Sequence, residues 1–399
     1  MVGEDVVDPA ASAADAVDPD EVLAFAQSLI AAPSENPGGT EDEAVAVAGG
    51  ILTDLGADVR VVRSPEGRPS IVARIGSGDR PRLVWNGHLD TVPVGDPSAW
   101  PADPFAGEVI DGRLVGRGAC DMKGPVASAL GAVSALRRSG APIGGTLDLH
   151  LVADEELSGV HGTRVLRDEG VLDQDAAVVG EPTELRVALA ERGGAWVRAV
   201  AHGKAAHGST PHLGVNAIVA MSRFVLRLPE VLPDRVHPLV GSPTVNVALV
   251  SGGSAPNVVP ERCEVEIDRR IVPGEDEPDE VLAPFRRLVA SLRDEDPSTE
   301  IELSLKEWTE AAETTGDSAI ASLVRDAIAE ETGSPPPFVG FTGITDARFY
   351  INDAHIPTVI VGPGSLALAH TVDESVGLDE LVTAARVYAR TFARFLAPS

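Results

Sequence analysis

The sequence is poor in lysine, and its net charge is strongly acidic. Lysine occurs only at Lys123, Lys204 and Lys306, and 61 acidic residues stand against 32 basic ones, for a formal net charge of -29. A chain this acidic is repelled by the phosphate groups of nucleic acids and by anionic lipid headgroups. We therefore expect neither a nucleic acid nor a membrane as a partner.

The sequence also has few cysteines, no signal-peptide pattern and no long apolar run. Cys120 and Cys263 stand far apart, and one pair makes neither a disulfide framework nor a cysteine-type zinc site. The N-terminus has no basic, apolar signal peptide, and no run approaches the roughly 20 apolar residues that span a bilayer. These absences predict a cytoplasmic protein. The acidic, Ala-rich segment 1–20 is expected to be a solvated arm.

The length and the apolar content predict two domains. At 399 residues, of which 44% are hydrophobic, the chain exceeds what one ordinary core supports. Short apolar runs separated by helical stretches are expected to form strands at 70–75, 83–85, 146–152, 176–179 and 358–361. Strands that alternate with helices predict an α/β domain, with a mostly parallel sheet and helices on both of its faces.

The middle of the chain has a different order of elements. We expect strands at 195–201, 244–250, 263–271 and 300–305, with helices at 215–228 and 279–293. This β-α-β-β-α-β order is that of the ferredoxin-like unit. The sequence therefore predicts an inserted lid or dimerisation domain at residues 192–308, within a catalytic, metal-binding domain made of residues 21–191 and 309–399.

Metal-type residues cluster just beyond the ends of predicted strands and before one helix. They are His88, Asp121, Glu156, Glu181 and His370. Open α/β sheets place their ligands beyond the carboxyl ends of their strands. Imidazole and carboxylate are ligands that Zn²⁺ takes. Five of them suit two ions better than one, and a carboxylate shared between two ions accounts for the set.

Two further acidic residues are candidates for supporting or catalytic roles beside the metal ligands. A ligating imidazole usually donates its second N–H to a carboxylate or a carbonyl, and Asp90 is the candidate partner of His88. The adjacent carboxylates of Glu155 and Glu156 repel each other and need a cation to coexist. If one of them binds metal, its neighbour can act as the general base.

These residues resemble a known family, the zinc aminoacylases and peptidases that include acetylornithine deacetylase and succinyl-diaminopimelate desuccinylase. The resemblance covers nearly the whole chain after the N-terminal arm. It implies one bridging carboxylate: His88 and Glu181 on one ion, Glu156 and His370 on the other, and Asp121 on both. It also implies a cis peptide bond after Asp121.

The resemblance also implies catalytic and substrate-contacting residues. Glu155 is the implied general base. His207, in the segment 203–209, is implied to reach across a homodimer and stabilise the oxyanion in the partner's active site. The residues implied to contact a small anionic substrate are Arg192, Asn257, Arg270 and Arg348. A guanidinium group grips a carboxylate through two hydrogen bonds, which suits an anionic amide.

The implied function is hydrolysis of the amide bond of an N-acyl amino acid or N-acyl diamino acid. The resemblance implies a hydroxide that bridges two Zn²⁺ ions, for which Co²⁺ or Mn²⁺ can substitute. The segment 180–183, with Glu181, favours the deacylase branch, whereas residues 365–369 lack a polar residue expected of a desuccinylase pocket. The alternatives are a metallo-dipeptidase or carboxypeptidase of the same fold and, more remotely, a non-catalytic binding protein.

Overall fold

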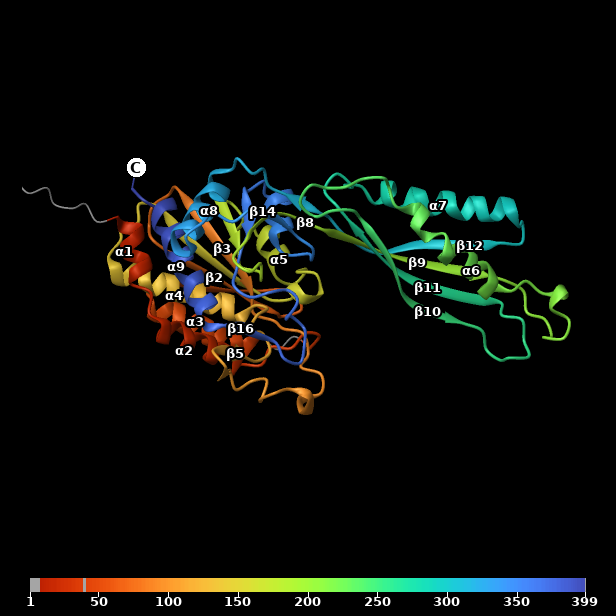
Figure 1. The fold of residues 1–399 in the computed structure, drawn as a ribbon, viewed down its shortest axis with the longest axis horizontal. Coiled ribbons are helices and arrows are strands. Elements are labelled where there is room, and N and C mark those ends of the chain that lie inside the picture. Colours follow the sequence, from red (N-terminus) through yellow and green to blue (C-terminus); the bar gives the residue numbers. More distant parts are fainter. Residues whose placement is uncertain (1–7, 39–40, 399) are drawn as a thin grey trace, which may run out of the picture. The chain divides into compact units, whose positions relative to one another are not determined.

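The chain divides into two compact units (Figure 1). The structure is a computed structural model that describes residues 8–38 and 41–398. Unit 1 consists of Met1–Leu189, Thr314–Val339 and Thr345–Ser399, and unit 2 of Ala190–Glu313 and Gly340–Ile344. The boundaries predicted for the insert, 192 and 308, fall inside the main segment of unit 2.

The largest sheet has a parallel centre. Its nine strands are β1 (Asp58–Arg63), β2 (Pro69–Ile75), β3 (Arg82–His88), β6 (Thr146–Val152), β7 (Ala176–Val179), β8 (Val187–Glu191), β13 (Ala312–Glu313), β14 (Phe338–Phe341) and β15 (Thr358–Ile360). The order is β1-β2-β6-β3-β7-β15-β8-β13, and β14 pairs with β8. Strands β6, β3, β7 and β15 run parallel, and the pairs toward the edges are antiparallel. The parallel strands read as apolar runs because both of their faces are buried.

Helices cover both faces of this sheet, as predicted. They are α2 (Pro19–Ile30), α3 (Asp42–Asp54), α4 (Lys123–Ser139), α5 (Thr163–Asp168), α8 (Ala319–Thr332) and α9 (Leu378–Phe395). Neighbouring residues of β3 point to opposite faces. Trp85 lies edge-on to Tyr388 of α9, with ring centroids 5.7 Å apart, whereas Val84 packs with Tyr350 on the other face. No helix among the described residues is long and apolar enough to cross a bilayer.

The prediction of a solvated N-terminal arm is wrong for its described part. Residues Pro9–Asp15 form helix α1, which packs on α4 and α9. Ala10, Ala13 and Ala14 are buried, and the Asp8 side chain caps the helix by accepting from the N–H of Ala10. Alanine favours the helix and lets it approach its neighbours closely. Residues 1–7 of the predicted arm lie outside the described residues.

A small sheet and several short helices border the strand ends of unit 1. The sheet has the order β16-β5-β4 and contains β4 (Glu108–Ile110), β5 (Arg113–Val115) and β16 (Ser375–Gly377). The short helices are η1 (Pro97–Ala99), η2 (Glu155–Leu157) and η5 (Phe349–Asp353). Pairing of β16 with β5 brings Glu374 beside the loop that precedes α4, where the Gly116 N–H donates to the Glu374 carbonyl over 3.1 Å.

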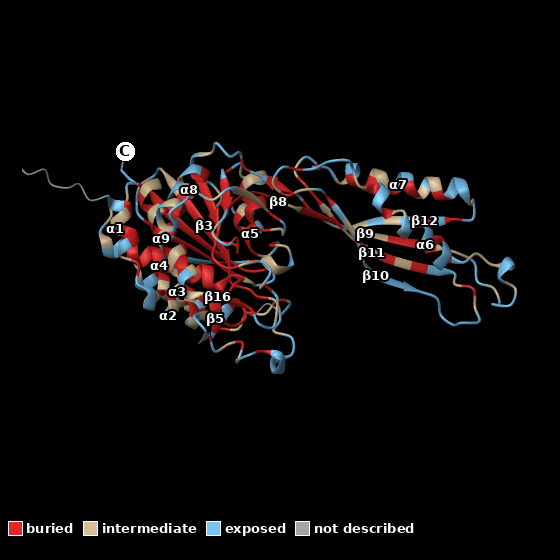
Figure 2. Cartoon of the chain, viewed as in Figure 1, coloured by how far each residue is buried: buried red, intermediate tan, exposed pale blue. Residues whose placement is uncertain are grey.

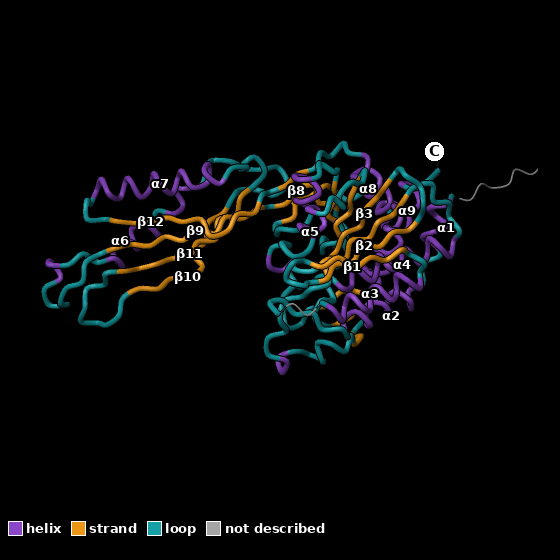
Figure 3. Tube along the Cα trace, turned by 180° about the vertical axis from the view of Figure 1, so that it is seen from behind, coloured by secondary structure: helices purple, strands orange, loops and turns teal. Residues whose placement is uncertain are grey.

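Unit 2 has the predicted ferredoxin-like order. It contains β9 (Gly193–His202), η3 (Pro211–Leu213), α6 (Ala217–Leu226), η4 (Leu228–Val231), β10 (Thr244–Gly252), β11 (Arg262–Ile271), α7 (Pro278–Glu295) and β12 (Glu300–Thr309). The sheet order is β10-β11-β9-β12, with all pairs antiparallel. Figure 3 traces the backbone of this sheet together with α6 and α7. Phe224 of α6 and Phe285 of α7 join the core formed with Val197 and Ile267 of the sheet. The opposite face is polar, which gives the strands their alternating pattern.

Candidate metal centre

The predicted ligands converge at one edge of the parallel strands in unit 1. His88 is the last residue of β3, Glu156 lies in η2 after β6, and Glu181 follows β7. His370 comes from the segment after β15, and Asp121 precedes Met122, the N-cap residue of α4. The carboxyl ends of parallel strands meet at the same edge, so residues far apart in the sequence become neighbours. We call these five residues the strand-end cluster.

Asp121 lies between two imidazole rings. Its Oδ1 is 3.0 Å from His88 Nε2, and its Oδ2 is 3.4 Å from His370 Nε2. His370 Nε2 is also 2.9 Å from Glu156 Oε2, whereas His88 Nε2 is 3.9 Å from Glu181 Oε1. The two oxygens of one carboxylate thus face two separate histidine and glutamate pairs. A carboxylate shared by two metal ions requires this arrangement.

The charges of the cluster fit a cation. Burial, together with the charge of nearby carboxylates, raises the pKa of Glu156 and raises that of Glu181 well above its usual range. Hydrogen bonds to Asp121 and Glu156 raise the pKa of His370 to about 10. The site therefore stabilises positive charge among buried carboxylates that otherwise repel one another. Imidazole and carboxylate donors in this setting suit a divalent metal ion.

A buried ion pair that the sequence did not reveal holds the main chain at Asp121. Glu374 Oε1 accepts hydrogen bonds from the N–H of Cys120 at 2.9 Å and of Asp121 at 3.0 Å. Its other oxygen accepts from Arg117 Nη1 at 2.5 Å. The peptide bond between Asp121 and Met122 is cis, as the resemblance implies. The sequence shows Arg117 in the glycine-rich loop. It does not show which carboxylate pairs with this arginine.

Asp90 supports both His88 and the η2 turn. The main-chain carbonyl of Asp90 lies 2.8 Å from His88 Nδ1, closer than its carboxylate at 3.5 Å. From the sequence, either a carboxylate or a carbonyl could pair with the second nitrogen of His88, and in the structure the carbonyl is the nearer partner. The carboxylate instead accepts from the N–H groups of Glu155 at 3.2 Å and Glu156 at 3.3 Å, and from Asn36 Nδ2 at 2.9 Å. Asp90 thus ties the turn to the end of β3.

The comparisons with known proteins agree with this geometry. A model of peptidase family M20/M25/M40 matches residues 84–394. The chain belongs to this family. The succinyl-diaminopimelate desuccinylase of Rhodospirillum centenum is 32% identical over 395 residues, which cover 94% of this chain and 97% of the relative. The acetylornithine deacetylase of Myxococcus xanthus is 32% identical over 332 residues, covering 82% of this chain and 83% of the relative.

Solved structures show the same fold. An M20 family metallo-carboxypeptidase from Sulfolobus solfataricus has a TM-score of 0.78 at 19% identity, covering 94% of this chain and 99% of that one. A dinuclear metal binding peptidase of the M20 family from Bacillus subtilis has a TM-score of 0.73 at 18% identity, covering 95% and 98%. The predicted family, fold class and enzyme class are confirmed: the chain is a metal-dependent M20 hydrolase that acts on amide bonds.

The remaining predicted residues of this M20 enzyme lie in both units. Arg348, in unit 1, is 6% exposed and donates to the carbonyls of Ser158 and Thr345, each over 2.5 Å. Arg192, in unit 2, donates to the Val240 carbonyl over 2.7 Å. Both guanidinium groups are engaged with the main chain, and contact of either with substrate stays a prediction.

His207 and Asn257 lie on two loops of unit 2 that pair with each other. His207 forms an isolated antiparallel bridge with Val258, and the Gly208 N–H donates to the Asn257 carbonyl over 2.7 Å. The side chains of His207 and Asn257 are exposed. Arg270, on β11, pairs with Asp268 at 3.0 Å. The structure brings His207 and Asn257 together, and their roles stay predictions, as does that of Arg270.

Asp346 is a second residue near the site that sequence reasoning missed. It is 1% exposed, and its Oδ2 accepts from Thr163 Oγ1 over 2.7 Å. Burial raises the pKa of Asp346 to about 6. Its charge also contributes to the raised pKa of Glu155. The sequence offered no apolar run ending at Asp346, so nothing marked it as a residue of the site.

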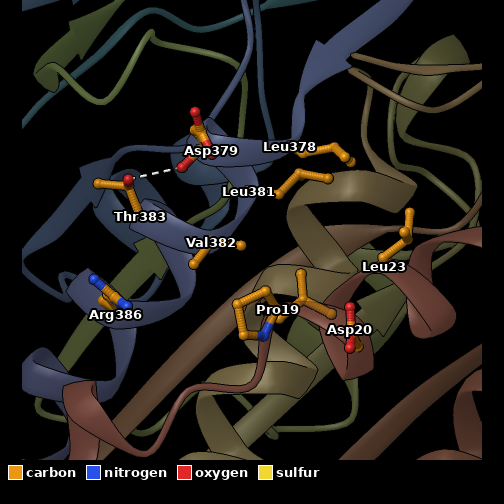
Figure 4. Close-up of a pocket in the computed structure, with 10 residues that line it drawn as sticks. Pro19, Asp20, Leu23, Leu378, Asp379, Leu381, Val382, Thr383 and Arg386 are labelled. Carbon is orange, nitrogen blue, oxygen red and sulfur yellow. Dashed lines mark hydrogen bonds between the residues drawn. The ribbon is translucent and has the colours of Figure 1, made fainter. Parts of the chain in front are cut away.

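A groove elsewhere in unit 1 does not contribute to this site (Figure 4). Residues from the start of α2 and the first half of α9, among them Leu23, Leu381 and Arg386, line it. The lining of this groove includes none of the strand-end cluster. The chemistry of the enzyme is therefore assigned to the edge of the parallel strands.

Proposed function

We propose that this M20 enzyme hydrolyses the amide bond of an N-acyl amino acid or N-acyl diamino acid, in the manner of a deacetylase or desuccinylase. The observation that carries the proposal is the position of Asp121, whose two oxygens face His88 and His370. The 32% identity to a desuccinylase and to a deacetylase supports this substrate class.

Two Zn²⁺ ions are the proposed cofactors, with Co²⁺ or Mn²⁺ as substitutes. His88 and Glu181 would hold one ion, Glu156 and His370 the other, and Asp121 both. Imidazole nitrogens and carboxylate oxygens are ligands that Zn²⁺ accepts. When bound, the ions polarise the amide carbonyl and lower the pKa of water.

Glu155 is the proposed general base. Burial and the charge of Glu181 raise the pKa of the Glu155 carboxyl well above its usual range. A base whose pKa is shifted toward neutrality transfers protons efficiently at neutral pH. Its carboxylate is 3.9 Å from His88 Nε2, which places it at the edge of the strand-end cluster. Glu155 takes a proton from the attacking water and returns it to the nitrogen of the leaving amine.

His207 is the proposed donor to the carbonyl oxygen that gains charge during hydrolysis. The N–H of Ser209 donates to His207 Nδ1 over 3.2 Å, so Nδ1 is an acceptor and the neutral ring carries its proton on Nε2. An exposed Nε2–H is free to donate to a group outside the loop. A donor of this kind contributes about 2.7–4 kcal/mol to transition-state stabilisation.

A homodimer formed through unit 2 is the proposed assembly in which His207 meets the partner's site. Strand β10 pairs only with β11 in the described sheet, and Figure 2 shows it largely exposed. Leu249 and Val250 of β10 are 62% and 72% exposed, and Val219 and Leu226 of the neighbouring α6 are 49% and 80% exposed. An open strand edge beside exposed apolar side chains is a surface suited to pairing with a second chain.

The proposed substrate is a small anion, and neither nucleic acid nor membrane is part of the proposal. At a net charge of -29, the protein needs local cationic groups to hold a carboxylate. Arg192 and Arg270 of unit 2 are the proposed cations, with Asn257 as a neutral hydrogen-bonding group. Guanidinium groups bind carboxylates with two parallel hydrogen bonds.

A dipeptidase or carboxypeptidase is the second candidate. The metallo-carboxypeptidase of Sulfolobus solfataricus shares the fold at a TM-score of 0.78, and the same hydrolytic residues serve either substrate. A non-catalytic binding protein is the third and most remote candidate. The presence of all five predicted ligands and of Glu155 argues against it.

Hydrolysis assays on the Zn²⁺-loaded protein test the proposal. We expect turnover of N-acetylornithine or N-succinyl-diaminopimelate, loss of the activity after chelation, and its return on adding Zn²⁺. A panel of dipeptides serves as the comparison. Turnover of dipeptides alone would replace the deacylase by a peptidase. Metal binding without turnover of any substrate would favour the binding protein.

A further inference from the structure

One oxygen of the Glu156 carboxylate is held by the main chain of a neighbouring loop. Glu156 Oε2 is 2.9 Å from His370 Nε2, whereas Oε1 accepts a hydrogen bond from the Val92 N–H over 3.2 Å. The last torsion of a glutamate side chain is broad, so the carboxylate turns easily unless a neighbour holds it. The Val92 N–H therefore limits the directions in which Oε2 can point.

Val92 begins a loop, residues 92–104, that is exposed along most of its length. The Thr91 N–H donates to the Ser34 carbonyl over 3.0 Å, and the Val94 N–H donates to Glu35 Oε1 over 2.8 Å. Residues 95–99, which include η1, are all exposed. A segment with few buried side chains opens easily unless specific contacts hold it. The position of the Val92 N–H therefore depends on the few residues that anchor this loop.

Trp100 is a buried residue of this loop and folds the loop back on itself. It is 7% exposed, and its indole N–H donates to the Val94 carbonyl over 2.9 Å. The guanidinium carbon of Arg117 lies 4.9 Å from the centroid of the indole ring. A guanidinium group is attracted to the face of an indole ring, and more strongly where water is excluded. Trp100 thus joins the start of the loop to Arg117.

Arg117 is itself fixed, so it gives the indole ring a rigid support. It is 2% exposed, and its Nη1 donates to Glu374 Oε2 over 2.5 Å. Its Nη2 donates to the Pro93 carbonyl over 3.3 Å, and its main-chain N–H donates to the Pro104 carbonyl over 2.9 Å. Both ends of the loop therefore meet at one buried arginine, and Trp100 packs on that arginine between them.

We propose that Trp100 is a positioning residue for Glu156, one of the proposed metal ligands. By packing on Arg117 and holding the Val94 carbonyl, it fixes the start of the loop. The Val92 N–H then stays on Glu156 Oε1, and Oε2 stays directed toward the imidazole that it faces. The inference rests on the proposed function, because it requires Glu156 to bind metal. Groups that orient a ligand in this way contribute to metal affinity without touching the ion.

Calorimetric titration of metal-free Trp100→Leu and Trp100→Phe with Zn²⁺ tests the proposal. The matched control is Trp308→Leu, which removes an indole from unit 2, where Trp308 packs against the cluster that contains Ala195 and Ile271. The Trp100 variants are also made in a His370→Ala background, which lacks a second proposed ligand of the ion that Glu156 would hold. Urea unfolding of each metal-free variant separates weaker binding from loss of folded protein.

We expect Trp100→Leu to weaken the binding of one of the two Zn²⁺ equivalents about 10–100-fold, because a ligand loses its support. Trp100→Phe keeps an aromatic ring over Arg117 and should retain part of the affinity, whereas Trp308→Leu should bind Zn²⁺ as wild type does. In the His370→Ala background, Trp100→Leu should leave the affinity of the remaining equivalent unchanged. Equal weakening with and without His370 would overturn the proposal, as would wild-type affinity in Trp100→Leu.

Amide hydrogen exchange shows whether the effect reaches the start of the loop. Exchange in residues 91–95 should be faster in Trp100→Leu, or in Trp100→Phe if the leucine variant does not fold, and unchanged in Trp308→Leu. Wild-type exchange in the Trp100 variants would overturn the proposal, because the loop would then hold without the indole. If wild type binds two Zn²⁺ ions but hydrolyses no substrate, the proposed function fails, whereas the titration and the exchange still decide the role of Trp100.

Discussion

The strand-end cluster of unit 1 and the paired loops of unit 2 are built in opposite ways. His88, Asp121 and Glu181 are buried, and Glu374 holds the main chain at Asp121 from a distant part of the sequence. His207 is exposed, and its side chain contacts that of Ser209, two residues away. The cluster is fixed by its own unit, whereas the histidine of the loop is left open to a group from outside.

The difference shows which side chains of the enzyme are held in a fixed geometry and which are not. Groups that hold a metal ion must keep their geometry before the substrate arrives, and supporting hydrogen bonds provide this. Asp90 shows the principle, since its carbonyl faces His88 while its carboxylate holds the Glu155 and Glu156 N–H groups. A donor such as His207, which acts on the reacting group alone, needs no such support until the complex forms.

Replacement of Glu155, at the edge of the strand-end cluster, should give the largest fall in kcat. Glu155→Gln removes the proposed base and keeps the shape of the side chain, so kcat should fall roughly 10²–10⁴-fold while bound metal stays unchanged. Glu184→Gln is the matched control, because that exposed side chain bonds to Ser365 and Arg186, neither of which belongs to the strand-end cluster. Wild-type turnover by Glu155→Gln would assign the proton transfer to another group.

Replacement of His207 tests the role of the paired loops of unit 2. His207→Ala should lower kcat about 10²–10³-fold without loss of metal, because one donor to the charged oxygen is lost. His212→Ala, an exposed histidine of the same loop, should retain the rate. Sedimentation checks the assembly in parallel. A fully active monomer would contradict the proposed role of His207 in a partner's site.

Loss of the support behind Asp121 should weaken metal binding without abolishing it. Glu374→Gln keeps one acceptor oxygen but loses the charge that pairs with Arg117, so metal affinity should fall about 10–100-fold. The neighbouring exposed residue offers the control Asp373→Asn, which should bind metal as wild type does. Competition with a chelator measures both. Equal affinity in the two variants would show that Asp121 needs no such support.

Burial within unit 1 should also appear as a pH dependence of stability. Burial lowers the pKa of His150 to about 4, so the unfolded chain takes up the proton first as the pH falls. The stability is present above about pH 6.5 and is lost as the pH falls toward 4. Between pH 7.5 and 5.5, wild type should lose about 1 kcal/mol more than His150→Gln in urea unfolding. An equal loss would contradict a buried, neutral His150.

The sequence predicted those features that local patterns encode. Strand β3 ends at His88, and β6 and β7 end shortly before Glu155 and Glu181, so the strand ends and their polar neighbours were visible together. The order of elements in unit 2 follows from alternating runs and turns in the same way. Such patterns depend on residues close in sequence, which is why they can be recognised without the structure.

Contacts between distant segments were not visible. Nothing in the sequence links Glu374 to the N–H of Asp121, or Arg348 to the Ser158 carbonyl. The Ala-rich start of the chain looked solvated because its packing surface, on α4 and α9, is formed by residues far along the chain. These features depend on tertiary packing, which composition and spacing do not determine.

Calorimetric titration of the metal-free protein with Zn²⁺ tests the central claim most directly. The account predicts about two equivalents of tightly bound Zn²⁺ per chain, because Asp121 presents one oxygen to His88 and the other to His370. His370→Ala should retain about one equivalent. Binding of no more than one Zn²⁺ by the wild-type chain would contradict the shared-carboxylate centre.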